Sequence, residues 1–379
     1  MSDRLLVTYR ITCAANEIGA RAKALAVEQS VEMPVEAIGD PRVLSEVVAT
    51  VESIRPLSPA PGGKDEKGAP SPLEESAFEV VLGIAAETTG NEASQLVNML
   101  FGNCSLQPEI ELADVAFPRG FAAAFPGPAF GLAGIRERAG ATSRTLTCTA
   151  LKPQGSTVEH LAALAGIFAR AGIDVIKDDH GLANPSTSPF AERVPAVQRA
   201  IDAANRETGG RTIYAPTFSG SPRALAAQMQ VARDTGVGAA LVAPMLVGPP
   251  VFVEMRRESG FVLLAHPAYA GAARVAPALL LGKLFRLFGA DATIFPNHGG
   301  RFSFSRGTCL AIAAAARDPW EDVKSALPVP AGGMSVERVD EMIADYGTDT
   351  MLLIGGALLT AGDALPAMSR EFVRRVHGK

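Results

Sequence analysis

Residues 173–180 read Ile-Asp-Val-Ile-Lys-Asp-Asp-His, a short apolar run that ends abruptly in an amine, two carboxylates and an imidazole. The run predicts a buried parallel strand that opens into its loop at Lys177. In parallel α/β folds, chemistry gathers at this carboxyl-terminal edge of the strands. Ionisable residues in a row are costly to bury unless they pair or bind a metal. The alternative interpretation is a solvated loop that simply follows a strand.

Beyond Arg144 the chain alternates regularly between strand-like and helix-like segments. Strands are expected at 145–151, 172–177, 212–215, 239–243, 261–265, 291–295, 327–330 and 350–354. Helices are expected at 157–171, 190–207, 222–236, 248–259, 272–287, 305–316, 335–345 and 359–375. This alternation predicts a (β/α)8 TIM barrel, because eight parallel strands close comfortably into a cylinder. An open doubly wound sheet is the alternative, but the glycine-rich dinucleotide turn that usually follows its first strand is missing from the sequence.

The amino-terminal part of the chain lacks this strict alternation and predicts a smaller α+β, ferredoxin-like domain. Its expected elements are strands at 4–12, 46–54 and 78–84, and helices at 16–29 and from about residue 91. Residues 57–75, rich in Pro, Gly and Ser, predict a surface loop or hairpin tip. We expect this domain to span residues 1–122 and the catalytic barrel to span residues 123–379.

Composition excludes several classes of protein. With 379 residues, 47% of them hydrophobic, the chain can bury a large core, and its net charge of −5 argues against binding to nucleic acid or a membrane surface. The four cysteines are far apart and are expected to be reduced thiols. The chain begins without a signal-peptide apolar run and has no uninterrupted apolar stretch of about 18 residues. We therefore expect a soluble, cytoplasmic protein.

Histidines and glycine pairs stand where the predicted barrel strands end. Three of the five histidines fall at such ends, His180, His266 and His298, which favours one shared site over three separate structural roles. The pairs Gly332-Gly333 and Gly355-Gly356 follow the last two strands, where barrels usually bind phosphate through main-chain N–H groups. Each pair alone could serve only a tight turn. Together they predict a phosphorylated small-molecule substrate.

Lys152 and Lys177 end adjacent predicted strands and are expected to face a shared mouth. Burial and neighbouring charges lower the pKa of a lysine, which leaves a general base or an amine that reacts with CO2. Asp179 offers carboxylate oxygen, the ligand that Mg²⁺ prefers. The alternative for either lysine is a cation that extends to solvent at the rim.

Together these residues resemble the large subunit of RuBisCO and its RuBisCO-like relatives, over most of the chain. The family's Lys-Asp-Asp-Glu stretch, with its carbamylated lysine and metal-binding acids, corresponds to residues 177–180. The Lys-Pro after strand one, whose lysine is a catalytic base, corresponds to Lys152-Pro153, and the strand-five histidine to His266. The glycine pairs correspond to the family's phosphate-binding backbone.

The resemblance also implies a homodimer with two composite active sites. Residues 26–30 resemble the family segment whose glutamate reaches into the neighbouring subunit, and 101–103 the segment that holds an active-site asparagine. Glu28 and Asn103 are therefore expected to be catalytic residues that serve the partner's barrel.

Departures from the family pattern indicate a RuBisCO-like protein and not a true carboxylase. His180 replaces the final metal-ligating glutamate, and Gln154 the second lysine of Lys-Pro-Lys. Pro267 replaces an arginine that binds the second phosphate, and the loop at 297–303 has no lysine to orient CO2. Fixation of CO2 on ribulose bisphosphate is therefore not expected.

The resemblance implies metal-dependent enolisation, of the isomerase, enolase or decarboxylase type, on a phosphorylated sugar or keto acid. Lys152 and His266 are expected to be catalytic, and carbamylated Lys177, Asp179 and His180 to hold Mg²⁺, or Mn²⁺ because imidazole suits that ion better. One phosphate is expected on the glycine pairs, with His298 and Arg301 at the substrate's other end. The alternative is a catalytically silent, phosphate-binding or regulatory homologue whose ligand set has decayed.

Overall fold

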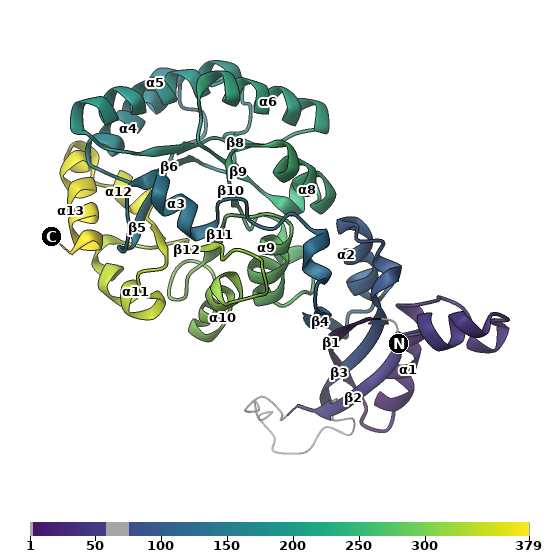
Figure 1. Cartoon of the computed structure of the whole chain (residues 1–379). Helices are drawn as coiled ribbons and strands as arrows, with labels where there is room; N and C mark the ends of the chain where they lie inside the picture. The colour runs from purple at the N-terminus through teal and green to yellow at the C-terminus, as the bar shows by residue number, and fades with distance from the viewer. Residues whose placement is uncertain (1–2, 58–75, 379) are drawn as a thin grey trace, which may run out of the picture. The chain divides into compact units, whose positions relative to one another are not determined.

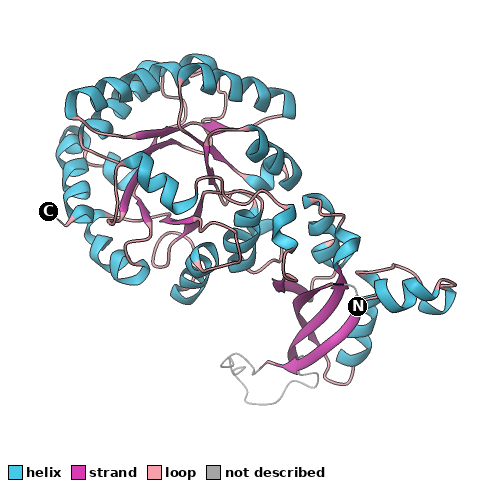
Figure 2. Ribbon diagram, in the orientation of Figure 1, coloured by secondary structure: helices cyan, strands magenta, loops and turns pink. Residues whose placement is uncertain are grey.

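The computed structural model describes residues 3–57 and 76–378 (Figures 1 and 2). The chain divides into two compact units, Met1–Phe125 with Ala272–Leu279, and Pro126–Gly271 with Leu280–Lys379. The loop predicted at 57–75 lies, apart from its first residue, outside the described residues. Among the helices that are described, none combines the length and apolar character needed to span a membrane.

The first unit is built on a four-stranded antiparallel sheet with the order β2-β3-β1-β4. Its strands are β1 Arg4–Cys13, β2 Thr50–Pro56, β3 Ser76–Ala85 and β4 Ile110–Ala116, and its longer helices are α1 Ile18–Glu28 and α2 Ala93–Phe101. Every second residue of β1 from Leu5 to Ile11 is buried, as expected for a strand with one covered face. Tyr9 of β1 donates a hydrogen bond to the Leu100 carbonyl of α2 (2.7 Å) and fixes that helix to the sheet. The predicted α+β unit is confirmed.

The segment 272–277 departs from the helix predicted at 272–287. Here the main chain runs beside β4, because Leu112 donates to the Arg274 carbonyl (2.9 Å) and accepts from the Ala276 N–H (2.8 Å). Pro277 follows, and a proline disfavours helical geometry in the residue before it. After the short 3-10 helix η6 Ala270–Ala272, helical structure therefore resumes only at η7 Ala278–Leu284 and continues into α9 Phe285–Leu287.

The second unit is a ring of parallel strands enclosed by helices (Figure 2). Its strands are β5 Leu146–Leu151, β6 Val175–Asp178, β7 Ile213–Ala215, β8 Thr217–Phe218, β9 Ala239–Val242, β10 Val262–Ala265, β11 Ala292–Pro296, β12 Leu327–Ala331 and β13 Met351–Leu353. Two ladders, β13-β5-β6-β7 and β12-β11-β10-β9-β8, make up the ring. β7 and β8 are halves of one strand on either side of Pro216, which has no N–H to donate. The predicted (β/α)8 barrel is confirmed.

The helices of this unit follow the predicted alternation, with breaks. They are α3 Gly131–Ala139, α4 Val158–Arg170, α5 Phe190–Thr208, α6 Pro222–Thr235, α7 Pro244–Val247, α8 Pro249–Glu258, α10 Arg306–Arg317, α11 Val339–Tyr346, α12 Gly356–Leu359 and α13 Leu365–His377. The helix predicted at 359–375 is wrong in its first part, because α12 ends at Leu359 and α13 begins only at Leu365. α3, which precedes the first barrel strand, was not predicted.

Candidate active site

The inward face of the barrel continues directly into the candidate site. Cys148 of β5 and Val175 of β6 belong to the buried barrel core. Side chains two residues apart on a strand point to the same face, so Lys177 and Asp179 continue the inward row that Val175 begins. The ladder register pairs Lys177 with Ala150, two residues before Lys152. Strand geometry therefore brings Lys152, Lys177 and Asp179 together at the carboxyl ends of β5 and β6.

Asp179 is the ionic centre of this group. Its Oδ1 accepts a hydrogen bond from Lys152 Nζ (2.8 Å) and lies 3.4 Å from His180 Nδ1. Burial alone would raise the pKa of Asp179, but the hydrogen bonds from His180 and Lys152 outweigh it and hold that pKa well below its usual range. In the part of the chain that the structure describes, Asp179 Oδ2 has no partner. This carboxylate is ionised and keeps one oxygen for a ligand.

Lys177 is almost completely buried, with 3% of its surface exposed. Its Nζ donates to the Asp178 carbonyl (3.0 Å). Burial lowers the pKa of Lys177, although electrostatic interactions with Cys148 and Asp179 oppose the shift. The amine is therefore more easily deprotonated than an exposed lysine, and a neutral amine is the form that reacts with CO2.

Two histidines from different strand ends stack in the same site. The rings of His180 and His266 lie 4.5 Å apart with an interplanar angle of 13°. The Ala268 N–H donates to His266 Nδ1 (3.1 Å), so the neutral ring carries its proton on Nε2. Burial, followed by the charges of Lys177 and His180, lowers the pKa of His266 to about 2. His266 is neutral at physiological pH and can donate a hydrogen bond from Nε2.

Asp178 supports the strand end from the opposite face and was missed as a candidate. It is fully buried, and its carboxylate accepts hydrogen bonds from the Tyr214 hydroxyl (2.8 Å), Arg193 Nε (3.2 Å) and the Thr217 N–H (3.1 Å). The period-two rule could have found this role, since Asp178 alternates with Lys177 and Asp179 along β6.

The glycine pairs leave main-chain donors uncommitted. Among the described residues, the N–H groups of Gly332, Gly333, Gly355 and Gly356 have no hydrogen-bond acceptor. A Cβ added to Gly355 would lie 3.8 Å from Lys152 Cε, so this pair lies against the lysine. Free N–H groups of this kind bind anions readily.

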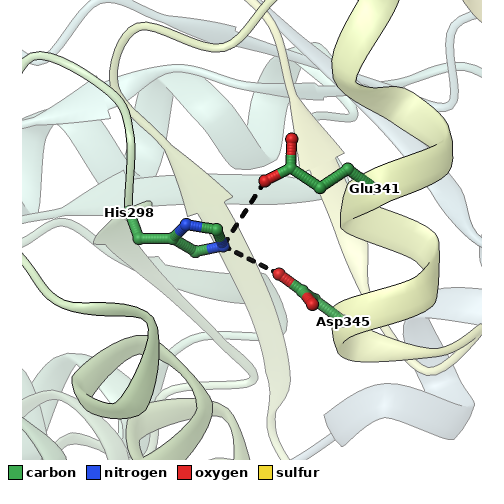
Figure 3. Close-up of side chains that lie close together, drawn as sticks. All are labelled: His298, Glu341 and Asp345. Atoms are coloured by element: carbon green, nitrogen blue, oxygen red, sulfur yellow. Dashed lines mark hydrogen bonds and ion pairs between the residues drawn. The ribbon is translucent and has the colours of Figure 1, made fainter.

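His298 and Arg301 lie on the loop between β11 and α10, and both have partners inside the protein. His298 Nε2 pairs with Asp345 Oδ2 (2.7 Å), as Figure 3 shows. The Arg301 guanidinium lies 5.1 Å from the centre of the Phe302 ring, and its main-chain N–H donates to the Gly332 carbonyl (3.2 Å). The loop therefore rests on the first glycine pair. Asp345 was missed because it lies on a helix and not at a strand end.

Glu28 and Asn103 both belong to the first unit, where the structure brings them together. Glu28 ends α1, Asn103 follows α2, and Asn103 Nδ2 donates to Glu28 Oε1 (2.9 Å).

A cavity of about 810 Å³ opens at the amino-terminal side of the barrel strands. Two of its three arginines are already neutralised, because Arg144 pairs with Asp174 (2.6 Å) and Arg136 with Asp349 (2.9 Å). Residues at this end of a barrel usually serve stability. The candidate active site is therefore the group at the carboxyl ends.

Fold and site define an α/β-barrel protein whose ionisable side chains gather at the carboxyl ends of the strands, as in barrel enzymes. Residues 131–300 match the ribulose bisphosphate carboxylase large chain, catalytic domain. The chain is 48% identical over 382 residues to ribulose bisphosphate carboxylase-like protein 1 of Rhodopseudomonas palustris, with 100% of both chains covered. It belongs to the RuBisCO large-chain family as a RuBisCO-like protein, which confirms the resemblance seen in the sequence.

Two further relatives carry the names of enzymes. The chain is 50% identical over 380 residues to 5-methylthioribulose-1-phosphate isomerase of Rhodospirillum rubrum, covering 100% of this chain and 97% of that protein. It is 35% identical over 281 residues to 2,3-diketo-5-methylthiopentyl-1-phosphate enolase of Geobacillus kaustophilus, covering 72% of this chain and 68% of the enolase.

Solved structures share the fold. The RuBisCO-like protein from Rhodopseudomonas palustris superposes with a TM-score of 0.88 at 48% identity, covering 99% of this chain and 98% of that one. The octameric RuBisCO from Pyrococcus horikoshii reaches a TM-score of 0.86 at 22% identity, covering 99% and 87% of the two chains, which shows a common fold alone.

Proposed function

We propose that this protein is a metal-dependent isomerase that enolises a sugar carrying a single phosphate, of the 5-methylthioribulose 1-phosphate type. The observation that carries the proposal is the Lys152–Asp179 ion pair (2.8 Å) beside buried Lys177 and the uncommitted N–H groups of Gly355 and Gly356. The isomerase relative is similar over the whole chain, and the enolase relative over about three quarters of it, which favours isomerisation.

Each group has a distinct part in this chemistry. In its neutral amine form, Lys152 takes a proton from the carbon next to the substrate carbonyl and returns it to the neighbouring carbon. Neutral His266 donates a hydrogen bond from Nε2 to a substrate oxygen. The N–H groups of the two glycine pairs bind the phosphate. A bound divalent ion supplies stabilisation of the negative charge that develops on the oxygen.

The residues present fit such an ion. Ionised Asp179 has a free oxygen, and His180 lies next to it with its Nδ1 towards Oδ1 (3.4 Å). The buried amine of Lys177 supplies a further oxygen ligand once it combines with CO2 to form a carbamate and releases a proton. Mg²⁺ accepts such oxygens, and Mn²⁺ accepts imidazole as well.

The proposal includes a homodimer in which Glu28 and Asn103 complete the partner's site, and a cytoplasmic location, which the four free cysteines support. It includes no CO2 fixation, because Pro267 stands where the family's second phosphate anchor would be. A silent phosphate-binding homologue is the second candidate, and His180 at a family glutamate position favours it.

Calorimetry with Mg²⁺ or Mn²⁺, with and without bicarbonate, separates the two candidates. We expect metal binding that strengthens with bicarbonate and disappears in Lys177→Ala, with exposed Lys23→Ala as the control. The metal-loaded protein should then incorporate solvent deuterium into a phosphorylated ketose without releasing CO2. No metal uptake under any condition would leave only the binding protein.

A further inference from the structure

His298, Glu341 and Asp345 form a side-chain cluster between the loop after β11 and helix α11 (Figure 3). His298 Nε2 lies 2.7 Å from Asp345 Oδ2 and 3.8 Å from Glu341 Oε1. Only 16% of the His298 side chain and 8% of the Asp345 side chain are exposed. The pair is therefore shielded from solvent and held in one arrangement.

The three groups are close enough to ligate a cation, but arginines already neutralise both carboxylates. Arg306 of α10 binds Asp345 Oδ1 through Nε (2.9 Å) and Nη2 (2.6 Å). Arg338 binds the two oxygens of Glu341 through Nε (2.9 Å) and Nη2 (2.7 Å). Two hydrogen bonds from one guanidinium to one carboxylate make a strong pair and leave little negative charge for an ion. The cluster is an ion-pair network and not a metal site.

The network is attached to the main chain of the loop. Arg338 Nη2 donates to the His298 carbonyl (3.1 Å). A Cβ added to Gly299 would lie 3.1 Å from Arg338 Nη2. One side of the loop is therefore fixed to the start of α11.

The other side of the loop is packed on Gly332. The Asn297 N–H donates to the Ala331 carbonyl (2.8 Å), and the Arg301 N–H donates to the Gly332 carbonyl (3.2 Å). A Cβ on Gly300 would lie 2.0 Å from the Gly332 oxygen, so the two loops meet main chain against main chain. Any movement of the His298 loop would therefore move the Gly332-Gly333 pair.

We infer that Asp345 is a positioning residue: by holding His298 and Arg306 it fixes the loop 297–301 against Gly332, and so keeps the phosphate-binding N–H groups in place. The inference rests on the proposed function, since it assigns Asp345 to the phosphate end of that site. Asp345 itself touches no substrate. It acts through His298, whose Nε2 lies 2.7 Å from Asp345 Oδ2 and donates to that carboxylate.

The test compares Asp345→Asn with Asp340→Asn, an exposed carboxylate on the same helix. Calorimetry with inorganic phosphate on the metal-loaded protein should show affinity reduced about tenfold to a hundredfold in Asp345→Asn, because a displacement of about 1 Å is enough for such a loss. Mn²⁺ affinity should stay at the wild-type value, since the proposed metal residues lie on another strand. Asp345→Glu, which keeps the carboxylate, should recover part of the phosphate affinity.

Two further measurements guard against a variant that merely folds poorly. Arg306→Gln changes an exposed residue and should weaken phosphate binding in the same direction by a smaller factor. Nitrogen NMR, with the His298 signal assigned by comparison with His298→Asn, should show the imidazole of His298 protonated on Nε2 in the wild type, and that signal should change in Asp345→Asn. Phosphate affinity within twofold of the Asp340→Asn control would overturn the positioning role. A wild type that binds no phosphate would instead overturn the proposed phosphate site itself.

Discussion

The charge states of single residues decide what the barrel mouth can do. Asp179 stays ionised because Lys152 and His180 donate to it, while burial favours the neutral forms of Lys177 and His266. The site thus combines one fixed anion with a reactive amine and a neutral hydrogen-bond donor. This combination suits proton transfer next to a carbonyl.

The neutral state of His266 should appear as acid sensitivity. Its pKa in the folded protein is about 2, whereas an unfolded histidine titrates near pH 6.5. Below about pH 6.5 the unfolded state binds a proton at His266 and the native state does not, so the free energy of unfolding falls as the pH falls. Between pH 7.5 and 5 this residue should cost about 2 kcal/mol of unfolding free energy.

Urea unfolding of the metal-free protein, followed through its single tryptophan Trp320, measures this loss. His266→Asn should show a loss smaller by about 2 kcal/mol over the same pH range, because asparagine does not titrate. His160→Asn, at an exposed position on α4, is the control and should behave like the wild type. Equal losses in His266→Asn and the wild type would show that His266 takes up its proton in the folded state.

The sequence could predict the residues at the strand ends but not their partners on helices. Lys152, Lys177 and Asp179 follow buried strand runs, and the geometry of a parallel barrel brings such ends together. His298 was predicted by the same rule. Its partner Asp345 lies 47 residues further along the chain on α11, where an acidic residue is ordinary on a helix surface. Only the packed structure reveals that contact.

At the scale of elements, one buried carboxylate joins four of them at the opposite end of the barrel. Asp291 precedes β11, and its Oδ1 accepts from the N–H groups of Phe130 (2.7 Å) and Gly131 (2.8 Å) at the start of α3. Its Oδ2 accepts from the Leu263 N–H of β10 (2.8 Å) and from Arg256 of α8 (2.8 Å). Asp291 therefore fixes where two helices meet the strands.

Asp291→Ala should destabilise the barrel strongly. The change leaves the buried Arg256 guanidinium without its carboxylate partner and three main-chain N–H groups without acceptors, which should cost about 3–5 kcal/mol. Urea unfolding followed through Trp320 measures the loss, with Asp363→Ala at an exposed position as the control. A loss below about 1 kcal/mol would mean that water replaces the missing carboxylate.

Helices and strands were predicted correctly where buried residues recur at a regular spacing along the sequence. The prediction failed where contact with a distant part of the chain determines the local structure. The barrel strands are short apolar runs, and each was found within a few residues of its true limits. Residues 272–277 are mostly apolar, as on a helix face, yet residues 274–276 run along β4, more than 150 residues earlier in the chain. Local periodicity carries no information about that pairing, so tertiary contacts overrode it.

At the scale of the whole molecule, two groups of proposed catalytic residues fall in separate compact units. Lys152, Lys177 and Asp179 lie in the barrel, while Glu28 and Asn103 form their own hydrogen-bonded pair in the first unit. The proposed composite site would explain the role of this Glu28–Asn103 pair. Each barrel would take it from the partner subunit, and a two-fold dimer would contain two such sites.

Shared sites can be tested by mixing two inactive subunits. Glu28→Gln damages only the donated pair, and Lys177→Ala damages only the barrel. When the two are co-expressed, random pairing makes half of the dimers mixed, and each mixed dimer has one intact site, so isomerase activity should reach about a quarter of the wild-type value.

Co-expression of Glu28→Gln with Asn103→Ala is the matched control. Both of its defects lie in the donated pair, so no intact site can form, and activity should stay at the level of the single variants. If co-expression of Glu28→Gln with Lys177→Ala also restores no activity, although mass spectrometry shows that mixed dimers have formed, then each complete site lies within one subunit.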